Sequence, residues 1–178
     1  NIVMRVLQVM AGAQYGGAEA FFVRLIGALQ RAGIKQKVLI RRNCSRARKL
    51  RQAGVEPREL KFGGKLDWRT PWKIKKEIEY FKPNIVLSWM NRATAMCPPG
   101  EFVHASRLGG YYDLKYYDGC DHLIGNTEDI VSYIVGQGWP EEKVHYLPNF
   151  VSSITEEPIQ RQEFYTPVSA PLFLCMGR

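Results

Sequence analysis

Short apolar runs alternate with longer segments of helical periodicity over residues 5–147, and this alternation limits the folds open to the chain. Neighbouring parallel strands need a long crossover between them, which is usually a helix. Strands and helices that alternate regularly therefore predict a parallel sheet with right-handed crossovers and helices on both faces. The fold class that we predict is α/β, with a doubly wound parallel sheet of the Rossmann-like type.

The individual elements are predicted from apolar spacing and from residues that begin or end helices. A helix over Ala18–Ala32 places Phe21, Phe22, Leu25, Ile26 and Leu29 on one face and ends before Gly33. Three more helices are expected from a cap at Ser45 to Ala53, from a cap at Thr70 to Phe81, and from Thr127 to Val135 behind a cap at Asn126. The expected strands are Arg5–Met10, Lys37–Ile40, Glu59–Phe62, Asn84–Trp89, Glu101–Ser106, Asp121–Asn126 and Val144–Leu147.

The pattern divides the chain into one domain and a remainder. We predict a domain over residues 4–150 and a polar, proline-bearing linker over residues 151–171. The closing stretch "PLFLCMGR" is expected to hold the first strand, residues 172–178, of a second domain that is truncated at Arg178. A lone apolar strand should pack on the first domain or on a neighbouring molecule, as in a strand-exchanged homodimer.

The formal net charge of +8 is concentrated in one segment. Residues 35–51 hold eight Lys or Arg and no acid. Charge runs are ordinarily solvated faces, but this unbalanced excess favours an anionic partner. We predict an anionic membrane surface, where each cation contributes about 1 kcal/mol, and no nucleic acid, because no recognition motif is present. The predicted patch consists of Arg41, Arg42, Arg46, Arg48, Lys49 and Arg51.

Neither a metal nor a resident cofactor is expected. The four cysteines lie far apart without a C-x-x-C pair, and Asp118 and Asp121 are one residue too far apart for D-x-D. No apolar run reaches the about 18 residues of a membrane span. Because the N-terminus also lacks the layout of a secretory signal, we expect a cytoplasmic protein, peripheral at the inner face of the membrane.

Two adjacent glycines, Gly16 and Gly17, lie where the first strand passes into the first helix. The amides at a helix N-terminus are unpaired and the helix dipole favours an anion there. Glycines without side chains let a phosphate approach the backbone closely, so we predict that this loop binds phosphate. A tight turn without a ligand is the alternative.

A dinucleotide is one candidate ligand for this loop. The stretch "GAQYGG" does not match G-x-G-x-x-G, and the second strand ends in "IRR" rather than in the acid that holds a ribose. An arginine at that point can hold the 2′-phosphate of NADP, so an NADP-binding oxidoreductase domain stays open. A non-catalytic module that binds anions or membranes is a further alternative.

The stretch "GGAEAFFVRLIGALQRAG" closely resembles the first helix of the family 4 glycosyltransferases, with its G-G-(A/V)-E pattern. The stretches "DHLIGNTEDIVSYIVGQGWPEEKVHYLPNFV" and "PLFLCMGR" resemble the end of that family's N-terminal domain and the first strand of its C-terminal domain. "SWMNRA" and "RLGGYYDLKYY" are similar to a bacterial subgroup of lipopolysaccharide-type sugar transferases.

The resemblance implies the N-terminal, acceptor-side domain of a two-domain GT-B fold. It implies a retaining, hexosyl-type glycosyltransferase that moves a sugar from a nucleotide-sugar donor, its co-substrate, to a glycan or lipid-linked acceptor of the bacterial surface, without a metal. The donor is then held mainly by the C-terminal domain, while Gly16 and Gly17 contact its phosphates. The family's pair of glutamates would lie beyond Arg178, so the chain alone is expected to be inactive.

Several residues that follow predicted strands are candidates for the site. The family's histidine after the strand Glu101–Ser106 is replaced by Arg107, which is the catalytic candidate, either as an anion-binding group or as half of a structural ion pair. For Glu19, a capping role and substrate contact are both open. The acceptor-binding candidates are Asn91, Arg92, Tyr111, Tyr112 and Asn126; the two tyrosines could equally pack on a surface turn.

Overall fold

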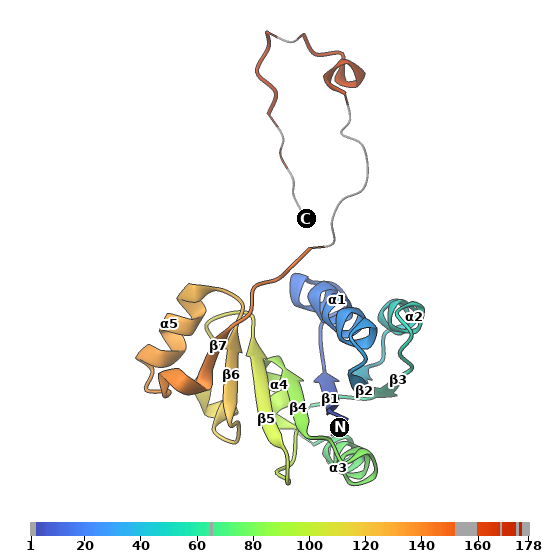
Figure 1. Ribbon diagram of the computed structural model, residues 1–178, viewed down its shortest axis with the longest axis vertical. Coiled ribbons are helices and arrows are strands. Elements are labelled where there is room, and N and C mark those ends of the chain that lie inside the picture. The colour runs from blue at the N-terminus through green and yellow to red at the C-terminus, as the bar shows by residue number, and fades with distance from the viewer. Residues whose placement is uncertain (1–2, 65, 152–159, 168, 174, 176–178) are drawn as a thin grey trace.

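The computed structural model describes residues 3–64, 66–151, 160–167, 169–173 and 175. Its strands form one parallel sheet in the order β3-β2-β1-β4-β5-β6-β7, and Figure 1 shows helices on both faces. The predicted doubly wound fold is therefore confirmed. The strands are β1 (Arg5–Met10), β2 (Lys35–Arg41), β3 (Pro57–Leu60), β4 (Ile85–Trp89), β5 (Val103–Leu108), β6 (His122–Gly125) and β7 (Val144–Tyr146).

In the described part of the chain, five helices and three short 3-10 turns connect and follow the strands. The helices are α1 (Gly17–Arg31), α2 (Cys44–Gln52), α3 (Arg69–Phe81), α4 (Met90–Ala95) and α5 (Glu128–Gly136), and the 3-10 turns are η1 (Leu114–Tyr117), η2 (Glu141–Lys143) and η3 (Arg161–Phe164).

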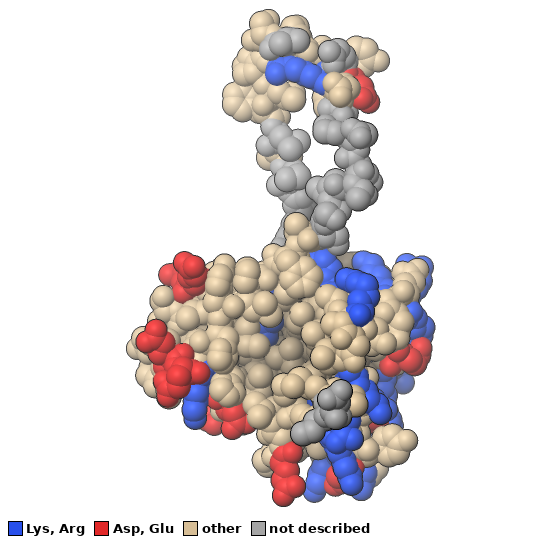
Figure 2. Space-filling model, in the orientation of Figure 1, with Lys and Arg blue, Asp and Glu red and all other residues tan. Residues whose placement is uncertain are grey.

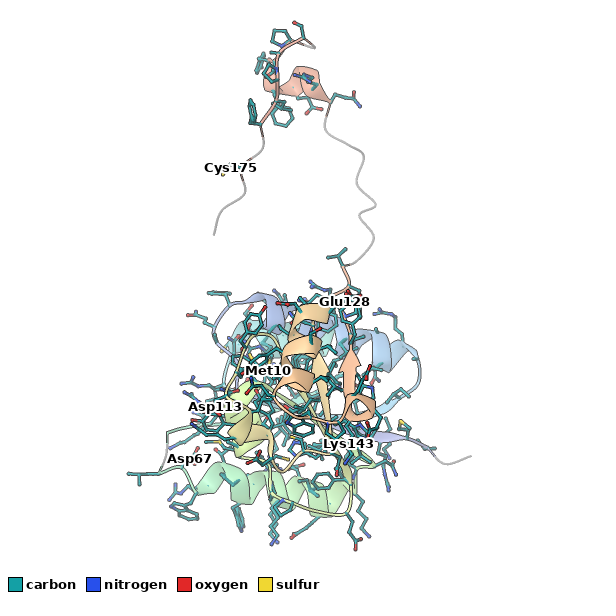
Figure 3. All side chains as sticks on the ribbon, turned by 90° about the vertical axis from the view of Figure 1, so that its left-hand side faces the viewer. Met10, Asp67, Asp113, Glu128, Lys143 and Cys175 are labelled. Carbon is teal, nitrogen blue, oxygen red and sulfur yellow. The ribbon has the colours of Figure 1, made fainter. Side chains whose placement is uncertain are left out.

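Apolar side chains hold the two layers of helices to the sheet. On one face, the predicted stripe of α1 is buried through Phe21, Phe22, Leu25 and Ile26 and packs with α2 against β1, β2 and β4. The other face carries α3 and α4 over the same strands, while α5 covers β6 and β7. The central strand β1 is buried on both faces, and Met10 at its end lies among side chains inside the domain (Figure 3).

Several predicted helix caps are wrong. Asn43, not Ser45, caps α2 by accepting a hydrogen bond from the Arg46 amide at 2.8 Å. Thr127, not Asn126, caps α5 by accepting from the Ile130 amide at 3.1 Å. At α3 the acceptor is a residue before the helix, Asp67, which receives the amide of the predicted cap, Thr70.

Strand positions also differ from the expectation in two places. The strand predicted over Glu59–Phe62 is Pro57–Leu60, and the strand predicted over Glu101–Ser106 is Val103–Leu108. The second difference matters because it moves Arg107 from a loop into β5. The helix α4, directly behind β4, was not predicted at all.

The predicted strand over residues 172–178 lies largely outside the described residues. Where it is described, Leu172 and Phe173 are exposed and belong to no strand. The expectation that this stretch packs on the domain is therefore wrong for these two residues. Packing on a second molecule stays a prediction.

Candidate functional site

The candidate site lies at the carboxyl edge of the sheet, next to β1 and β4. The chain leaves β1 towards β2 and leaves β4 towards β5, so the strand order reverses between these two strands. Open α/β sheets bind their ligands outside the carboxyl ends of the strands at such a reversal. The loop before α1, the start of α4 and the end of β5 all meet this edge.

The start of α1 presents bare backbone. Gly16 is the N-cap residue, and no side chain in the described part of the chain caps the helix. A Cβ atom placed on Gly17 would find no atom within 4 Å, so the space beside this residue is open, whereas one placed on Gly16 would meet the Glu19 carboxylate. Unpaired amides at the positive end of a helix dipole are suited to bind an anion. The predicted phosphate-binding glycines have this geometry.

Glu19 and Arg46 hold the loop before α1 from two sides. The Glu19 carboxylate accepts a hydrogen bond from the Ala13 amide at 2.7 Å, and the Arg46 guanidinium donates to the Ala13 carbonyl. Both side chains are buried. A Cβ atom on Gly16 would overlap the Glu19 carboxylate, so this glycine is required for the clamp itself. Burial lowers the pKa of Arg46, and the charge of Glu19 opposes that effect.

This clamp gives Glu19 a role beyond capping its own helix. Glu19 and Arg46 lie 27 positions apart in the sequence and meet at the backbone of Ala13, which no local pattern reveals. Gly12 completes the arrangement with φ at +47°, a conformation that favours glycine. A side chain on Gly12 would also come within 2.9 Å of the Arg46 guanidinium.

Arg107 lies buried at the carboxyl end of β5, with 1% of its surface exposed. Its guanidinium stacks over the rings of Phe21 at 4.5 Å and Trp89 at 5.0 Å, and donates to the Asn149 side chain at 2.5 Å. Within the described part of the chain it has no carboxylate partner, and its Nε atom has no hydrogen-bond acceptor. Burial lowers its pKa to about 10, so it keeps its charge at neutral pH.

The segment behind β7 covers Arg107. Asn149 binds its guanidinium, and the neighbouring Phe150 packs edge-on against Phe21 with ring centroids 4.9 Å apart. Arg24 of α1 donates to the Phe150 carbonyl at 3.0 Å. Asn149 was not predicted as a site residue, because nothing in the "LPNF" pattern places it over β5.

Two acceptor-binding candidates lie at the same edge. Asn91, at the start of α4, accepts a hydrogen bond from the hydroxyl of Tyr117, whose pKa is raised by burial. Tyr112 is half-buried, and its pKa is raised first by burial and then by the charge of Glu19.

The other three candidates have different surroundings. Arg92 donates to the Phe62 carbonyl at 3.5 Å, in the loop before α3. The Tyr111 hydroxyl donates to Asp129 in the first turn of α5, and its ring lies edge-on to Tyr133. Asn126 does not cap α5, and its buried side-chain oxygen has no hydrogen-bond partner in the described part of the chain.

Some side chains of the basic segment are exposed, and others form an ion pair or a hydrogen bond within the domain. Arg41, Arg42, Arg48 and Lys49 are exposed, and Figure 2 shows Lys and Arg along the side of the domain with α1, α2 and α3, while the side with α5 and η2 carries mainly Asp and Glu. Arg51 is held by a bidentate ion pair with Glu56 at 2.9 Å. The placement of Arg46 in an exposed patch is wrong, because the Ala13 clamp buries it.

Among the described residues, no three His, Cys, Asp or Glu side chains are grouped so that they could hold a metal ion. No helix in the same part of the chain combines the length and apolar character needed to cross a bilayer.

Two curated relatives are similar along nearly the whole chain. The lipopolysaccharide core biosynthesis glycosyltransferase LpsD of Rhizobium meliloti is 29% identical over 178 residues, which cover 98% of this chain and 51% of LpsD. The glycosyltransferase LpsE of the same organism and the same description is 33% identical over 172 residues, 92% of this chain and 48% of LpsE. The chain thus spans about half the length of the curated relatives it matches.

Solved structures agree with the fold. A glycosyltransferase from Rickettsia africae superimposes with a TM-score of 0.71 at 13% identity, covering 83% of this chain and 43% of that protein. HepE of Anabaena, in complex with UDP-glucose, superimposes with a TM-score of 0.62 at 12% identity, covering 82% of this chain and 44% of HepE. The fold is that of the N-terminal domain of GT-B proteins. The family model for Glycosyltransferase Family 4 matches residues 15–153, and the chain belongs to that family.

Proposed function

We propose that the protein carrying this chain transfers a sugar from a nucleotide-sugar donor to a glycan or lipid-linked acceptor in lipopolysaccharide-type synthesis. The family assignment supports the reaction class, and the descriptions of LpsD and LpsE support the pathway. The UDP-glucose complex of HepE supports a nucleotide sugar as the donor. Neither an NADP-binding oxidoreductase nor a non-catalytic module has comparable support.

The open start of α1 is the observation that carries the proposal. Sugar transfer from such a donor needs a group that stabilises the departing diphosphate, and preorganised backbone amides provide this at little reorganisation cost. The amides behind Gly16 and Gly17 are unobstructed by any cap, and the Ala13 clamp holds the loop in place before substrate arrives.

Arg107 adds a fixed positive charge behind these amides. It has no carboxylate among the described residues to neutralise it, and the surrounding aromatic rings lower the local dielectric constant. A cation that is desolvated and not paired attracts negative charge that develops nearby. We assign Arg107 to electrostatic stabilisation of the leaving group, with Asn149 as the residue that orients it.

On the acceptor side, Asn91 and Tyr112 are the candidates best placed to contact a sugar. Both follow strand ends at the carboxyl edge, Asn91 after β4 and Tyr112 after β5. Asn126 has less support than these two, because its side-chain oxygen, which lacks a hydrogen-bond partner in the described part of the chain, is buried and not open to a sugar hydroxyl.

A nucleotide-release assay tests the proposal. The protein carrying this chain is incubated with UDP- and GDP-sugars, with and without lipopolysaccharide core acceptors, and the anomeric configuration of the product is read by NMR. We expect acceptor-dependent release of one nucleotide and retention at the anomeric carbon. Binding of a nucleotide sugar without transfer to any core acceptor would contradict the proposed reaction.

The outer face of α2 supports a finer proposal, namely attachment to an anionic membrane. Arg48 and Lys49 are exposed there without an ion pair in the described part of the chain. Each cation near such a surface contributes about 1 kcal/mol, so two or three together give weak, salt-sensitive binding. Sedimentation with phosphatidylglycerol-containing vesicles should exceed that with phosphatidylcholine alone, and equal binding to both would refute the attachment.

A further inference from the structure

Two cavities flank Asn43 between the loop before α1 and the start of α2. One, of about 460 Å³, extends along α1 and α2 and reaches Gly16. The other, of about 600 Å³, lies between residues 12–15 and the end of β2. Asn43 separates them, since its side chain donates to the Gln14 carbonyl at 3.3 Å. Both volumes fall in the range of about 300–1,000 Å³ that is usual for small-molecule sites.

The charged side chains that line these cavities are mainly positive. Five basic residues line them: Arg24, Arg41, Arg42, Arg46 and Lys49. Glu19 is the single acid among the lining residues, and it is buried and occupied by the Ala13 amide. In the described part of the chain, Arg41, Arg42 and Lys49 form no ion pair. Like charges gathered in a concave surface repel one another, and a bound anion relieves that repulsion.

We propose that these cavities bind the acidic group, a phosphate or a carboxylate, of the glycan acceptor. The inference rests on the proposed function, because it assigns the bound anion to the second substrate of that reaction. Arg41 and Arg42 lie at the end of β2 and contact the anion, and Tyr15, exposed beside both cavities, provides an aromatic face for a sugar ring.

Position favours the acceptor over an unrelated anion. Gly16 lines the cavity of about 460 Å³ that extends along α1. It is also the N-cap residue of α1, the helix to which we assign the donor phosphates. A molecule bound at Arg41 and Arg42 can extend past Tyr15 to the carboxyl edge of the sheet, where transfer occurs. The donor cannot supply this anion as well, because its diphosphate is assigned to the amides of α1.

Binding of small probes to the 178-residue chain tests the site. Titration calorimetry compares glucose 6-phosphate, glucuronic acid, glucose and inorganic phosphate, and sedimentation uses vesicles of phosphatidylcholine with and without phosphatidylglycerol. We expect both sugar acids to bind more tightly than glucose. The double variant Arg41→Gln/Arg42→Gln should weaken their binding by about tenfold or more, which is the loss of one or two charge-assisted hydrogen bonds.

The control variant Lys73→Gln/Lys76→Gln removes the same charge from exposed positions on α3. It should leave sugar-acid binding unchanged. An equal loss in the control, or equal affinity for glucose and glucose 6-phosphate, would overturn the proposal. Loss of vesicle binding without any change towards sugar acids would assign Arg41 and Arg42 to a lipid headgroup instead, and this too would overturn it.

The result of this binding experiment can be distinguished from the result of the nucleotide-release assay. If nucleotide release depends on the acceptor but sugar-acid binding is insensitive to Arg41 and Arg42, only the proposed anion-binding site is refuted. Conversely, sugar acids can bind as expected in a protein that transfers no sugar, in which case the reaction is wrong and the site is an anion site of another kind.

Discussion

Gly17→Ala should stabilise the domain and weaken nucleotide binding at the same time. Alanine is a better helix former than glycine by about 1 kcal/mol in a helix interior, and somewhat less in the first turn. Nothing lies within 4 Å of the new methyl group, so no clash offsets this gain. For a domain of this size the melting temperature should rise by about 1–3 °C.

The same methyl group occupies the space in which we place the donor diphosphate. If it displaces one charge-assisted hydrogen bond, binding weakens by about 1.5–3 kcal/mol, which is roughly 10- to 150-fold. Differential scanning fluorimetry and titration with UDP or GDP on the protein carrying this chain measure the two effects. A role as a turn residue alone would leave nucleotide binding unchanged.

Gly136→Ala is the matched control. Gly136 is the last residue of α5, and a Cβ atom there also meets nothing within 4 Å. It should raise stability without changing nucleotide affinity. If Gly17→Ala binds nucleotide as tightly as the unmodified protein, or if both variants lose affinity alike, the assignment of the phosphate site to the start of α1 fails.

Three further predictions concern charged side chains that are buried or hydrogen-bonded. Arg107→Met should lower the transfer rate by about tenfold or more. The free energy of unfolding should change by less than about 1 kcal/mol, because methionine packs between the rings without a desolvation cost. A large drop in melting temperature with full activity would indicate a structural role. Glu77→Ala should cost about 2 kcal/mol in urea unfolding, because the buried Glu77 carboxylate bridges Lys37 at 3.0 Å and Arg58; a loss below about 0.5 kcal/mol would contradict this estimate. The hydroxyl of Thr70 and the Gly63 amide lower the pKa of Asp67 from 3.8 to about 2, so its stabilisation is present above its unfolded pKa and disappears as the pH falls through about 2. The stability difference between the unmodified chain and Asp67→Asn should therefore shrink from pH 4 towards pH 2, and a constant difference would show that the charge is not involved.

Position at the start of α3 explains why Asp67 matters although it was not predicted. Figure 3 shows it beside that end of the helix, and its carboxylate receives both the amide and the hydroxyl of Thr70. The sequence contains a better-known signal at the same place, Thr70 followed by Pro71, which predicts a cap. The local pattern located the helix correctly but could not decide between neighbouring polar residues for the role of acceptor.

The apolar elements were predictable because burial dictates their spacing. The strand β1 follows from a short apolar run that is buried on both faces, and the buried stripe of α1 follows from the 3.6-residue period. By contrast, α4 has six residues and begins at Met90 with φ at +62°, a left-handed conformation that is uncommon outside glycine. Neither its length nor its first residue resembles a helix signal.

The misplaced end of β5 has a physical cause that bears on the site. Ser106 was predicted as the last residue of the strand and Arg107 as the first residue after it, yet both are buried within β5. Ser106 shares hydrogen bonds with Thr94 at 2.7 Å and with the Ser88 carbonyl at 3.2 Å. Polar residues can continue a central strand when partners distant in the sequence satisfy them, and a single segment contains no information about such partners.

The same reasoning separates the predictable part of the site from the rest. Gly16 and Gly17 can be proposed from the sequence because a helix N-terminus creates binding chemistry from backbone atoms alone, and their binding of phosphate stays a prediction. The contribution of Arg107 depends on Asn149, 42 residues later, and on two aromatic rings from other elements. A buried cation that lacks a carboxylate partner among the described residues is costly to the fold. Its retention at the carboxyl edge, beside the open amides of α1, is the strongest physical reason to connect it with an anionic ligand.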